Sequence, residues 1–270
     1  MKIAILYSGG LDSFILKKYM EETYPDAEIK CIYYAHGADS EIQEISQLPD
    51  YVEVKKIDWL TASCRPMAKR DDPFAGAIYI PGRNLVFCVL AASQELADEI
   101  VMGTVYDEDN PKGTDKNELF REGTSALLSY VLSPFIKKVK IRFPFVENRW
   151  TKRECVKWAL KNNVTPEELT STVSCWNHHG TPCGECKQCF KRYLVFKLNG
   201  FEESYLQHPL NSGYGLTLID DYLDAYYHKN CNKDEREVVR NLFDAYNKNL
   251  LPAQVMKYLD PVDKYRGWDL

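Results

Sequence analysis

The chain opens with the segment MKIAILYSGGLDSFILKKYM, residues 1–20, and this segment decides the fold. Its continuous apolar run Ile3–Tyr7 predicts a strand that is covered on both faces of a parallel sheet. Apolar residues then recur at positions 15, 16, 19 and 20, which predicts a helix with one buried face. A buried strand followed at once by a helix begins a βαβ unit, so we expect a parallel sheet around it.

The loop between this strand and this helix predicts an anion-binding site. It consists of Ser8, Gly9, Gly10, Leu11, Asp12 and Ser13. The glycines allow a tight turn and a close approach to an anion, while the helix start presents backbone N–H groups and the positive end of its dipole. Ser8 and Ser13 can donate hydroxyl hydrogen bonds, and Asp12 suits a magnesium ion or the geometry of the helix start. The loop is neither a Walker A motif nor a dinucleotide fingerprint, and a plain turn capped by Ser or Asp is the alternative interpretation.

The following residues alternate between strand and helix patterns. Further strands are expected at Ile29–Tyr34, Tyr51–Ile57, Glu99–Val105 and Lys138–Phe145, and helices at Ser40–Leu48, Leu85–Leu96, Leu119–Val131 and Thr151–Asn162. Asn84 is the expected cap of the helix that follows it, and Thr151 with Glu154 forms an expected capping box. This order predicts an α/β fold with a doubly wound parallel sheet in residues 1–169. Residues 61–82, with their prolines, charges and glycines, are expected to form a loop.

Four of the nine cysteines crowd into one short segment with the spacing C-x7-C-x2-C-x2-C, at Cys175, Cys183, Cys186 and Cys189. Short x2 spacings let thiolates converge on one tetrahedral ion, so the pattern predicts a structural zinc site in residues 170–200. A ligand role for His178 or His179 in place of one cysteine, and an iron–sulfur cluster, are the alternatives. The remaining cysteines, Cys31, Cys64, Cys88, Cys155 and Cys231, are expected to be small core residues.

Residues 201–270 are rich in tyrosine, and Tyr222–His228 and Asp234–Tyr246 have helical patterns. We therefore expect a helical C-terminal extension as a third part of the chain, packed on the rest of it. Self-association into a homodimer and contact with another partner are the alternative roles of this extension.

Length and charge limit the classes of function. A chain of 270 residues, 45% of them hydrophobic, is long enough to bury a full core. A formal net charge of −5 argues against a long nucleic-acid surface. The sequence contains neither an apolar run of the roughly 20 residues that a membrane helix needs nor a signal-peptide cleavage pattern. We therefore expect a cytoplasmic-type protein without membrane contact.

The loop Ser8–Ser13, directly after an N-terminal strand, resembles the signature of the PP-loop ATP pyrophosphatases, which have an adenine nucleotide alpha hydrolase-like fold. Those enzymes cleave ATP between its α and β phosphates and activate a substrate oxygen as an adenylate, from which a nitrogen or sulfur nucleophile displaces AMP. Two further segments, YIPGRNLVF at Tyr79–Phe87 and, more weakly, Arg142–Phe145 with Lys152, add to the cysteine pattern. Together these motifs make residues 1–200 similar to the 7-cyano-7-deazaguanine synthase (QueC) family.

This resemblance implies a reaction and a set of site residues. ATP with Mg²⁺ adenylates the carboxylate of 7-carboxy-7-deazaguanine, ammonia displaces AMP to give an amide, and a second ATP drives dehydration of the amide to the nitrile. The loop Ser8–Ser13 would bind ATP, and Asp12 and Arg83 would be the catalytic groups, with Arg83 pairing with phosphate or with the substrate carboxylate. The groups implied to contact the deazapurine are Arg83, Asn84, Asp107 and Asp115, and the four clustered cysteines would hold zinc.

Two segments depart from the family pattern. The family carries Asp-Tyr-Ser-Gly-Tyr-Pro-Asp-Cys-Arg after its fourth strand, whereas residues 107–120 read DEDNPKGTDKNELF, with Lys116 and Asn117 in place of Cys-Arg. The second strand is followed by YAHGAD, residues 34–39, where the family tends to have Tyr-Gly-Gln-Arg-His. These changes leave open an enzyme that stops at the amide or joins the acid to another amine, even one on a protein.

Two further classes of function remain as alternatives. One is a PP-loop enzyme that modifies tRNA, against which the net charge of −5 argues. The other is a binding protein that keeps the fold without turnover, against which the intact loop Ser8–Ser13 argues.

Overall fold

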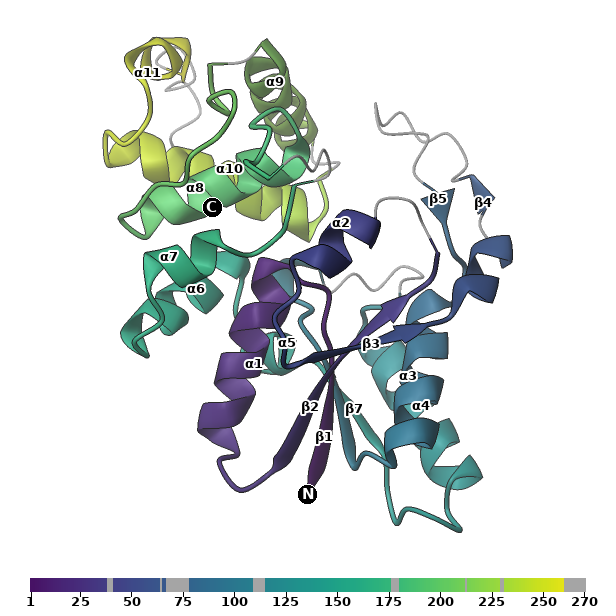
Figure 1. Ribbon diagram of the computed structural model, residues 1–270. Helices are drawn as coiled ribbons and strands as arrows, with labels where there is room; N and C mark the ends of the chain where they lie inside the picture. Colours follow the sequence, from purple (N-terminus) through teal and green to yellow (C-terminus); the bar gives the residue numbers. More distant parts are fainter. Residues whose placement is uncertain are drawn as a thin grey trace. The chain divides into compact units, whose positions relative to one another are not determined.

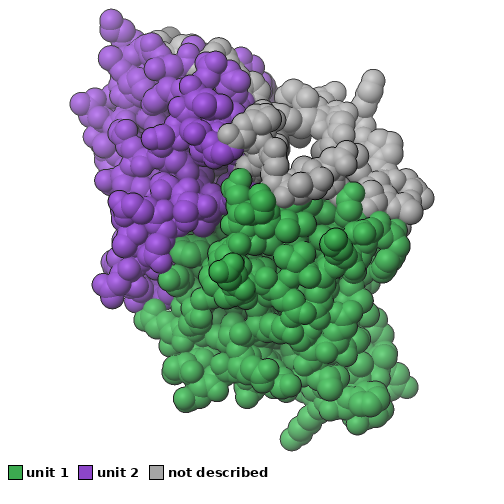
Figure 2. Space-filling model, viewed as in Figure 1, with its two compact units in different colours: residues 1–104, 111–144 green, residues 105–110, 145–270 purple. Residues whose placement is uncertain are grey.

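The computed structural model describes residues 1–37, 41–63, 65–66, 78–108, 115–175, 180–211, 213–228 and 231–259. The chain divides into two compact units, coloured separately in Figure 2. Unit 1 comprises residues 1–104 and 111–144, and unit 2 comprises residues 105–110 and 145–270. The three-part division into residues 1–169, 170–200 and 201–270 stays a prediction about separately folding parts.

Unit 1 is built on a five-stranded sheet with the strand order β3-β2-β1-β6-β7. The strands are β1 (Lys2–Leu6), β2 (Glu28–Ala35), β3 (Val52–Lys56), β6 (Glu99–Met102) and β7 (Lys140–Arg142). Every pairing in this sheet is parallel, and Ile5 of β1 lies opposite Cys31 on one side and Val101 on the other. The side chains of Ile3, Ala4 and Ile5 in β1 are buried, as their apolar run predicts. The predicted doubly wound parallel sheet is thus confirmed.

Helices cover both faces of this sheet. They are α1 (Leu11–Thr23), α2 (Glu41–Ser46), α3 (Arg83–Glu95) and α4 (Glu118–Val131), with a 3₁₀ turn η1 (Asp58–Ser63). Helix α1 packs against β1 and β2, α3 packs against β1 and β6, and α4 packs against β7. Figure 1 shows α1 on one side of the sheet and α3 and α4 on the other. The short antiparallel strands β4 (Arg65–Pro66) and β5 (Ile78–Tyr79) lie in the segment that was predicted to be a loop.

The prediction that Asn84 caps its helix is wrong. Helix α3 begins at Arg83, and its N-cap is Gly82, which has a φ of +71°. Glycine tolerates this left-handed conformation, so the chain enters the helix two residues earlier than the Asn pattern predicts. Asn84 therefore lies in the first turn of α3, where it is buried. The predicted capping box of Thr151 is confirmed.

Unit 2 is helical in its described residues. Its elements are η2 (Tyr106–Glu108), α5 (Pro144–Glu147, which begins at the end of unit 1), α6 (Lys152–Lys161), α7 (Pro166–Thr170), α8 (Lys187–Leu198), α9 (Gly213–Tyr227), α10 (Lys233–Asn247) and α11 (Ala253–Leu259). Phe190 and Leu194 of α8 share one apolar core with Ile219 of α9, Leu242 of α10 and Val255 of α11. The C-terminal extension therefore packs on α8. Among the described residues, no helix is both long and apolar enough to cross a membrane.

One buried ion pair joins the segments of unit 2 that flank the cysteines. The guanidinium of Arg192 on α8 donates to both carboxylate oxygens of Glu203, each at 2.7 Å. Both side chains are almost fully buried, with exposed fractions of 4% and 3%. The same guanidinium also donates to the Leu169 and Thr170 carbonyls and to the Thr172 and Ser174 hydroxyls. Arg192 thus fixes the chain that enters the cysteine segment to the helix that leaves it.

We predict that Arg192→Met lowers the free energy of unfolding by about 3–5 kcal/mol, because it leaves the Glu203 carboxylate buried without its partner. Denaturant unfolding followed by circular dichroism measures this loss. The double change Arg192→Met with Glu203→Leu should recover a large part of it, since no unpaired charge then remains. The matched control is Arg121→Met, which removes a pair with the exposed Glu118 and should cost less than about 1 kcal/mol. Equal losses for the two single variants would contradict the role given to Arg192.

Candidate active site and metal centre

The strand order of unit 1 reverses direction at β1. From β1 the chain runs through α1 to β2 on one side, whereas β6 pairs with the other side of β1. The two helices next to β1 cover opposite faces, so the carboxyl ends of β1 and β6 form the switch point of the sheet. Ligands of open α/β sheets bind at such switch points. The loop Ser8–Ser13 follows β1 at this place.

The loop has the geometry of an anion site. Gly9 has a φ of +76°, which glycine adopts without strain. The N-cap of α1 is Gly10, which has no side chain to satisfy the first amide groups of the helix. Ser13 is buried, and its hydroxyl donates to the Gly10 carbonyl at 2.9 Å and lies 3.3 Å from the Ser8 amide. The buried Ser13 hydroxyl therefore stabilises the turn. The N–H groups at the start of α1 and the positive end of its dipole remain available for an anion.

Gly103, which sequence reasoning missed, permits a close approach of two backbone segments at this edge of the sheet. It directly follows β6, and a Cβ atom on it would lie 3.1 Å from both the Asp12 carbonyl carbon and the Ser13 amide nitrogen. A contact of this kind lets β6 support the first turn of α1 without an intervening side chain. The available signal in the sequence was a glycine immediately after a buried strand.

Glu41 is a second residue that sequence reasoning missed. Its carboxylate accepts hydrogen bonds from the His36 and Gly37 amides at 3.1 and 2.7 Å and lies 3.1 Å from the His36 ring nitrogen Nε2. Glu41 is buried, and it fixes the chain that leaves the carboxyl end of β2, next to β1. The expected departure from the family at residues 34–39 falls at this place, although Ala38 and Asp39 lie outside the described residues.

The remaining predicted site residues are divided between the two units. Arg83 and Asn84 begin α3, whose last turn leads into the amino end of β6, so they belong to the carboxyl edge of the sheet. Asp115 lies ahead of α4 in the same unit, and together with burial its charge raises the pKa of Cys88 to about 12. Asp107 belongs to unit 2, in η2. Unit 1 thus contains the loop Ser8–Ser13 with Arg83, Asn84 and Asp115. Asp107 belongs to unit 2 and is not grouped with them.

We predict that Gly103→Ala weakens ATP binding at least tenfold, or about 1.4 kcal/mol, because the added methyl group displaces the first turn of α1. Isothermal titration with a non-hydrolysable ATP analogue measures the dissociation constant. Gly123→Ala is the matched control, because a Cβ atom there would meet nothing within 4 Å, and the helix should gain slightly in stability. Unchanged affinity in Gly103→Ala would show that this backbone approach does not position the loop.

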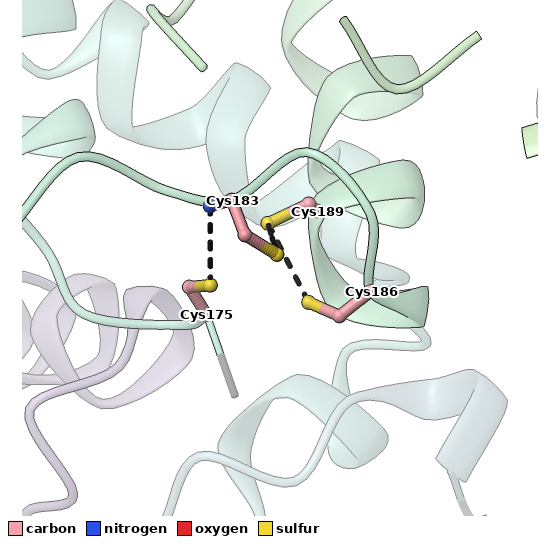
Figure 3. Close-up of side chains that lie close together, drawn as sticks. All are labelled: Cys175, Cys183, Cys186 and Cys189. Atoms are coloured by element: carbon pink, nitrogen blue, oxygen red, sulfur yellow. Dashed lines mark hydrogen bonds between the residues drawn. The ribbon is translucent and has the colours of Figure 1, made fainter. Parts of the chain in front are cut away.

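The four clustered cysteines lie close together in unit 2, and Figure 3 shows their side chains gathered at the start of α8. All four are buried, and their sulfur atoms lie within 4.8 Å of one another. Cys186 is the N-cap of α8, and its Sγ lies 3.5 Å from that of Cys189, three residues along the helix, while Cys183 Sγ is 3.9 Å from Cys189 Sγ. A tetrahedral ion with metal–sulfur bonds of about 2.3 Å requires sulfur–sulfur distances of about 3.8 Å. The donor set therefore fits one metal ion.

Two backbone features shape this cluster. Gly184 has a φ of +77°, and a Cβ atom on it would lie 1.6 Å from the Gln207 carbonyl oxygen. The Cys183 amide donates to Cys175 Sγ and the Glu185 amide to Cys183 Sγ, which stabilises charge on these sulfurs. The hydrogen bond from Cys186, with burial, raises the pKa of Cys189, so a bound metal must displace protons here. His178 and His179, the alternative ligands, lie outside the described residues.

We predict that Gly184→Ala abolishes metal binding, because its methyl group would overlap the Gln207 carbonyl and displace the loop. Elemental analysis of the purified protein measures the metal content. Gly180→Ala is the control, because Gly180 also has a positive φ of +87° but a Cβ atom there meets nothing within 4 Å. It should retain its metal, and loss of metal in both variants would assign the effect to backbone strain instead of the overlap.

A doubly wound parallel sheet with this phosphate-type loop after its first strand, followed by a four-cysteine segment, defines an enzyme of the PP-loop class. The chain belongs to the QueC family: the model of that family, described as queuosine biosynthesis protein QueC, matches residues 2–200.

Curated relatives with the name 7-cyano-7-deazaguanine synthase agree with this assignment. The chain is 27% identical over 224 residues to that of Methanobrevibacter smithii, covering 73% of this chain and 93% of the relative. It is 25% identical over 223 residues to that of Sulfolobus acidocaldarius, covering 75% of this chain, and it spans only about half (47%) of that relative's length. Over 135 residues it is 35% identical to that of Campylobacter jejuni, with 46% of this chain and 54% of the relative covered.

Among solved structures, the U34-tRNA thiolase NcsA from Methanococcus maripaludis with its [4Fe-4S] cluster matches with a TM-score of 0.37 and 12% sequence identity. The match covers 93% of this chain and 72% of that one.

Proposed function

We propose that this protein converts 7-carboxy-7-deazaguanine, with ATP and ammonia, into 7-cyano-7-deazaguanine. The observation that carries the proposal is the loop Ser8–Ser13 at the switch point of the sheet, in a chain that matches the QueC family over residues 2–200. The name shared by the curated relatives supports the same product.

The chemistry follows from the weakness of a carboxylate as an electrophile. A carboxylate oxygen of the substrate attacks the α phosphorus of ATP, and pyrophosphate leaves. Ammonia then adds to the acyl carbon, AMP leaves with the C–O bonding pair, and an amide forms. The amide oxygen attacks a second ATP in the same way, and loss of AMP and protons leaves the nitrile. Each step needs charge stabilisation and positioning more than a strong general base.

The chain's own residues suit these tasks. The N–H groups at the start of α1 and the hydroxyl of Ser8 would hold phosphate oxygens. Asp12, in the first turn of α1, would hold the Mg²⁺ that accompanies ATP. Arg83 is exposed at the start of α3, where its guanidinium would pair with phosphate or with the substrate carboxylate. Its always-charged planar fork can donate two hydrogen bonds to either anion.

We further propose that the four cysteines hold a structural Zn²⁺. Four thiolates leave no open position for a substrate, and separations of 3.5 and 3.9 Å between two of the sulfur pairs suit one tetrahedral ion. The ligands of a multi-iron cluster bind different iron atoms, which sets their sulfurs farther apart. Bound zinc would fix the chain between α7 and α8 and would supply no group to the reaction.

A second candidate is an enzyme that stops at the amide or joins the acid to another amine. Asn117 stands where the family carries Arg, and its side chain accepts the Phe120 amide at 2.9 Å as the N-cap of α4. A buried capping residue replaces a cation here, so recognition of the substrate differs from the family pattern at this position.

Release of AMP and pyrophosphate from ATP with 7-carboxy-7-deazaguanine and ammonium tests both candidates, with mass spectrometry of the deazapurine product. We expect the nitrile, and a reduction of at least a hundredfold in AMP release for Asp12→Asn and Arg83→Ala. Arg121→Ala, on α4 and outside the predicted site residues, serves as the control and should keep full activity. An amide or an amine conjugate as final product would establish the second candidate. AMP release with tRNA, and none with the acid, would overturn both.

A further inference from the structure

Unit 2 contains a small cavity that the reaction described above does not use. It lies between η2, the start of α6, α8 and α10, and its volume is about 40 Å³. Among its lining groups are Asp107, Lys152, Lys191, Asp234, Glu237 and Asn241. Three of these, on α10, lie beyond the residues 2–200 that match the QueC family. The cavity is therefore completed by the C-terminal extension of this chain.

Two residues that line this cavity each have a buried oxygen atom that needs a hydrogen-bond donor. Asn241 has an exposed fraction of 4%, and its Oδ1 has no partner among the described residues. The Oδ1 of Asp107 is also buried and likewise has none within the described part of the chain. A buried acceptor without a donor costs about 1–3 kcal/mol, so such groups are normally satisfied by a ligand or by ordered water. Both atoms require a species that donates.

Carboxylates outnumber ammonium groups among the side chains that line the cavity. Four carboxylates line it, those of Asp107, Glu108, Asp234 and Glu237, against the two side-chain ammonium groups of Lys152 and Lys191. Lys191 is already engaged with Asp234. Burial, with the nearby Asp234, raises the pKa of Asp107 to about 7, and burial also raises the pKa of Glu237. A donor that carries a positive charge therefore suits the cavity better than a neutral one.

The size and the mixed lining narrow the choice of cation. A cavity of about 40 Å³ accommodates a group of one or two heavy atoms. A divalent ion demands a full shell of oxygen ligands, and the two lysines at the cavity repel its double charge about twice as strongly as a single charge. An ammonium group donates three or four hydrogen bonds, which matches separate carboxylate and amide acceptors.

We propose that this cavity binds an ammonium group, either as free ammonium or as the head of a primary amine. The site would hold the nitrogen nucleophile of the reaction. This role rests on the proposed function, because that reaction consumes ammonia or another amine. The binding itself requires no turnover. Because α10 supplies three of the named lining groups, recognition of the nitrogen compound would depend on the extension.

Thermal unfolding tests the binding directly, with ammonium chloride, methylammonium chloride, potassium chloride and tetramethylammonium chloride at constant ionic strength. We expect ammonium at ten times its dissociation constant to raise the Tm by about 2–4 °C at pH 8. Tetramethylammonium cannot donate and should have no such effect. A response to methylammonium equal to or larger than that to ammonium would identify a primary amine as the ligand, and a response to ammonium alone would identify the free ion.

Two variants separate binding from stability. Asn241→Leu removes the acceptor at nearly constant shape, so it should keep or raise the Tm and abolish the response to ammonium. Asp107→Asn should lose the response as well, and it keeps the test available if the leucine variant fails to fold. The matched control is Asn247→Leu, an exposed position on the same helix, which should respond like the unmodified protein.

The outcomes distinguish this proposal from the proposed function. Equal Tm shifts with ammonium, potassium and tetramethylammonium would overturn the ammonium site, and so would an unchanged Tm shift with ammonium in Asn241→Leu. Ordered water would then be the occupant of the cavity. If the enzyme forms the nitrile, Asn241→Leu should raise the KM for ammonium at least tenfold and leave the KM for ATP unchanged. A Tm response without AMP release would reject the proposed reaction and keep the binding site.

Discussion

The pairing of β1 with a parallel strand on each side is the constraint on which the position of the loop Ser8–Ser13 depends. Ile5 of β1 is in register with Cys31 of β2 and with Val101 of β6. Because right-handed crossovers place α1 and α3 on opposite faces, the carboxyl ends of β1 and β6 lie between the two helices, at the switch point of the sheet. The glycine loop and Gly103 meet at this point, where the backbone can approach a phosphate group closely.

Unit 2 depends on a different kind of contact, a single buried guanidinium. Arg192 connects the segment before Cys175 with Glu203, and its donors are distributed over carbonyl, hydroxyl and carboxylate oxygens. Buried charges persist where such a network satisfies them, and they then specify one arrangement of the chain. The Leu206 and Gln207 amides also bond the Pro182 and Cys183 carbonyls, so the chain after α8 covers the cysteine loop. The extension thus contributes to the metal centre as well as to the apolar core.

The C-terminal extension gives this member of the QueC family an apolar core and a cavity lining that lie beyond the residues matched by the family model. Helix α10 buries Val239 and Leu242 in the core and directs Glu237 and Asn241 to the cavity beside Asp107. One amphipathic helix therefore stabilises unit 2 and supplies polar groups to a site. At the other departure from the family, Asn117 exchanges a cation for a helix cap. Under the proposed function both changes would affect how the substrates are bound, whereas the loop after β1 and the four cysteines keep the family pattern.

Local pattern determined much of this protein from its sequence alone. The apolar run before Ser8, the spacing of the cysteines and the capping box at Thr151 each depend on neighbours within a few residues, and each prediction of local structure was confirmed. The start of α3 was misplaced because the φ of Gly82, which the fold imposes, outweighed the capping preference of Asn84. Gly103, Glu41 and the cavity at Asn241 depend on contacts between segments far apart in the chain. Periodicity and spacing do not predict such contacts, because they depend only on neighbouring residues. Packing brings these distant segments together only in the tertiary structure.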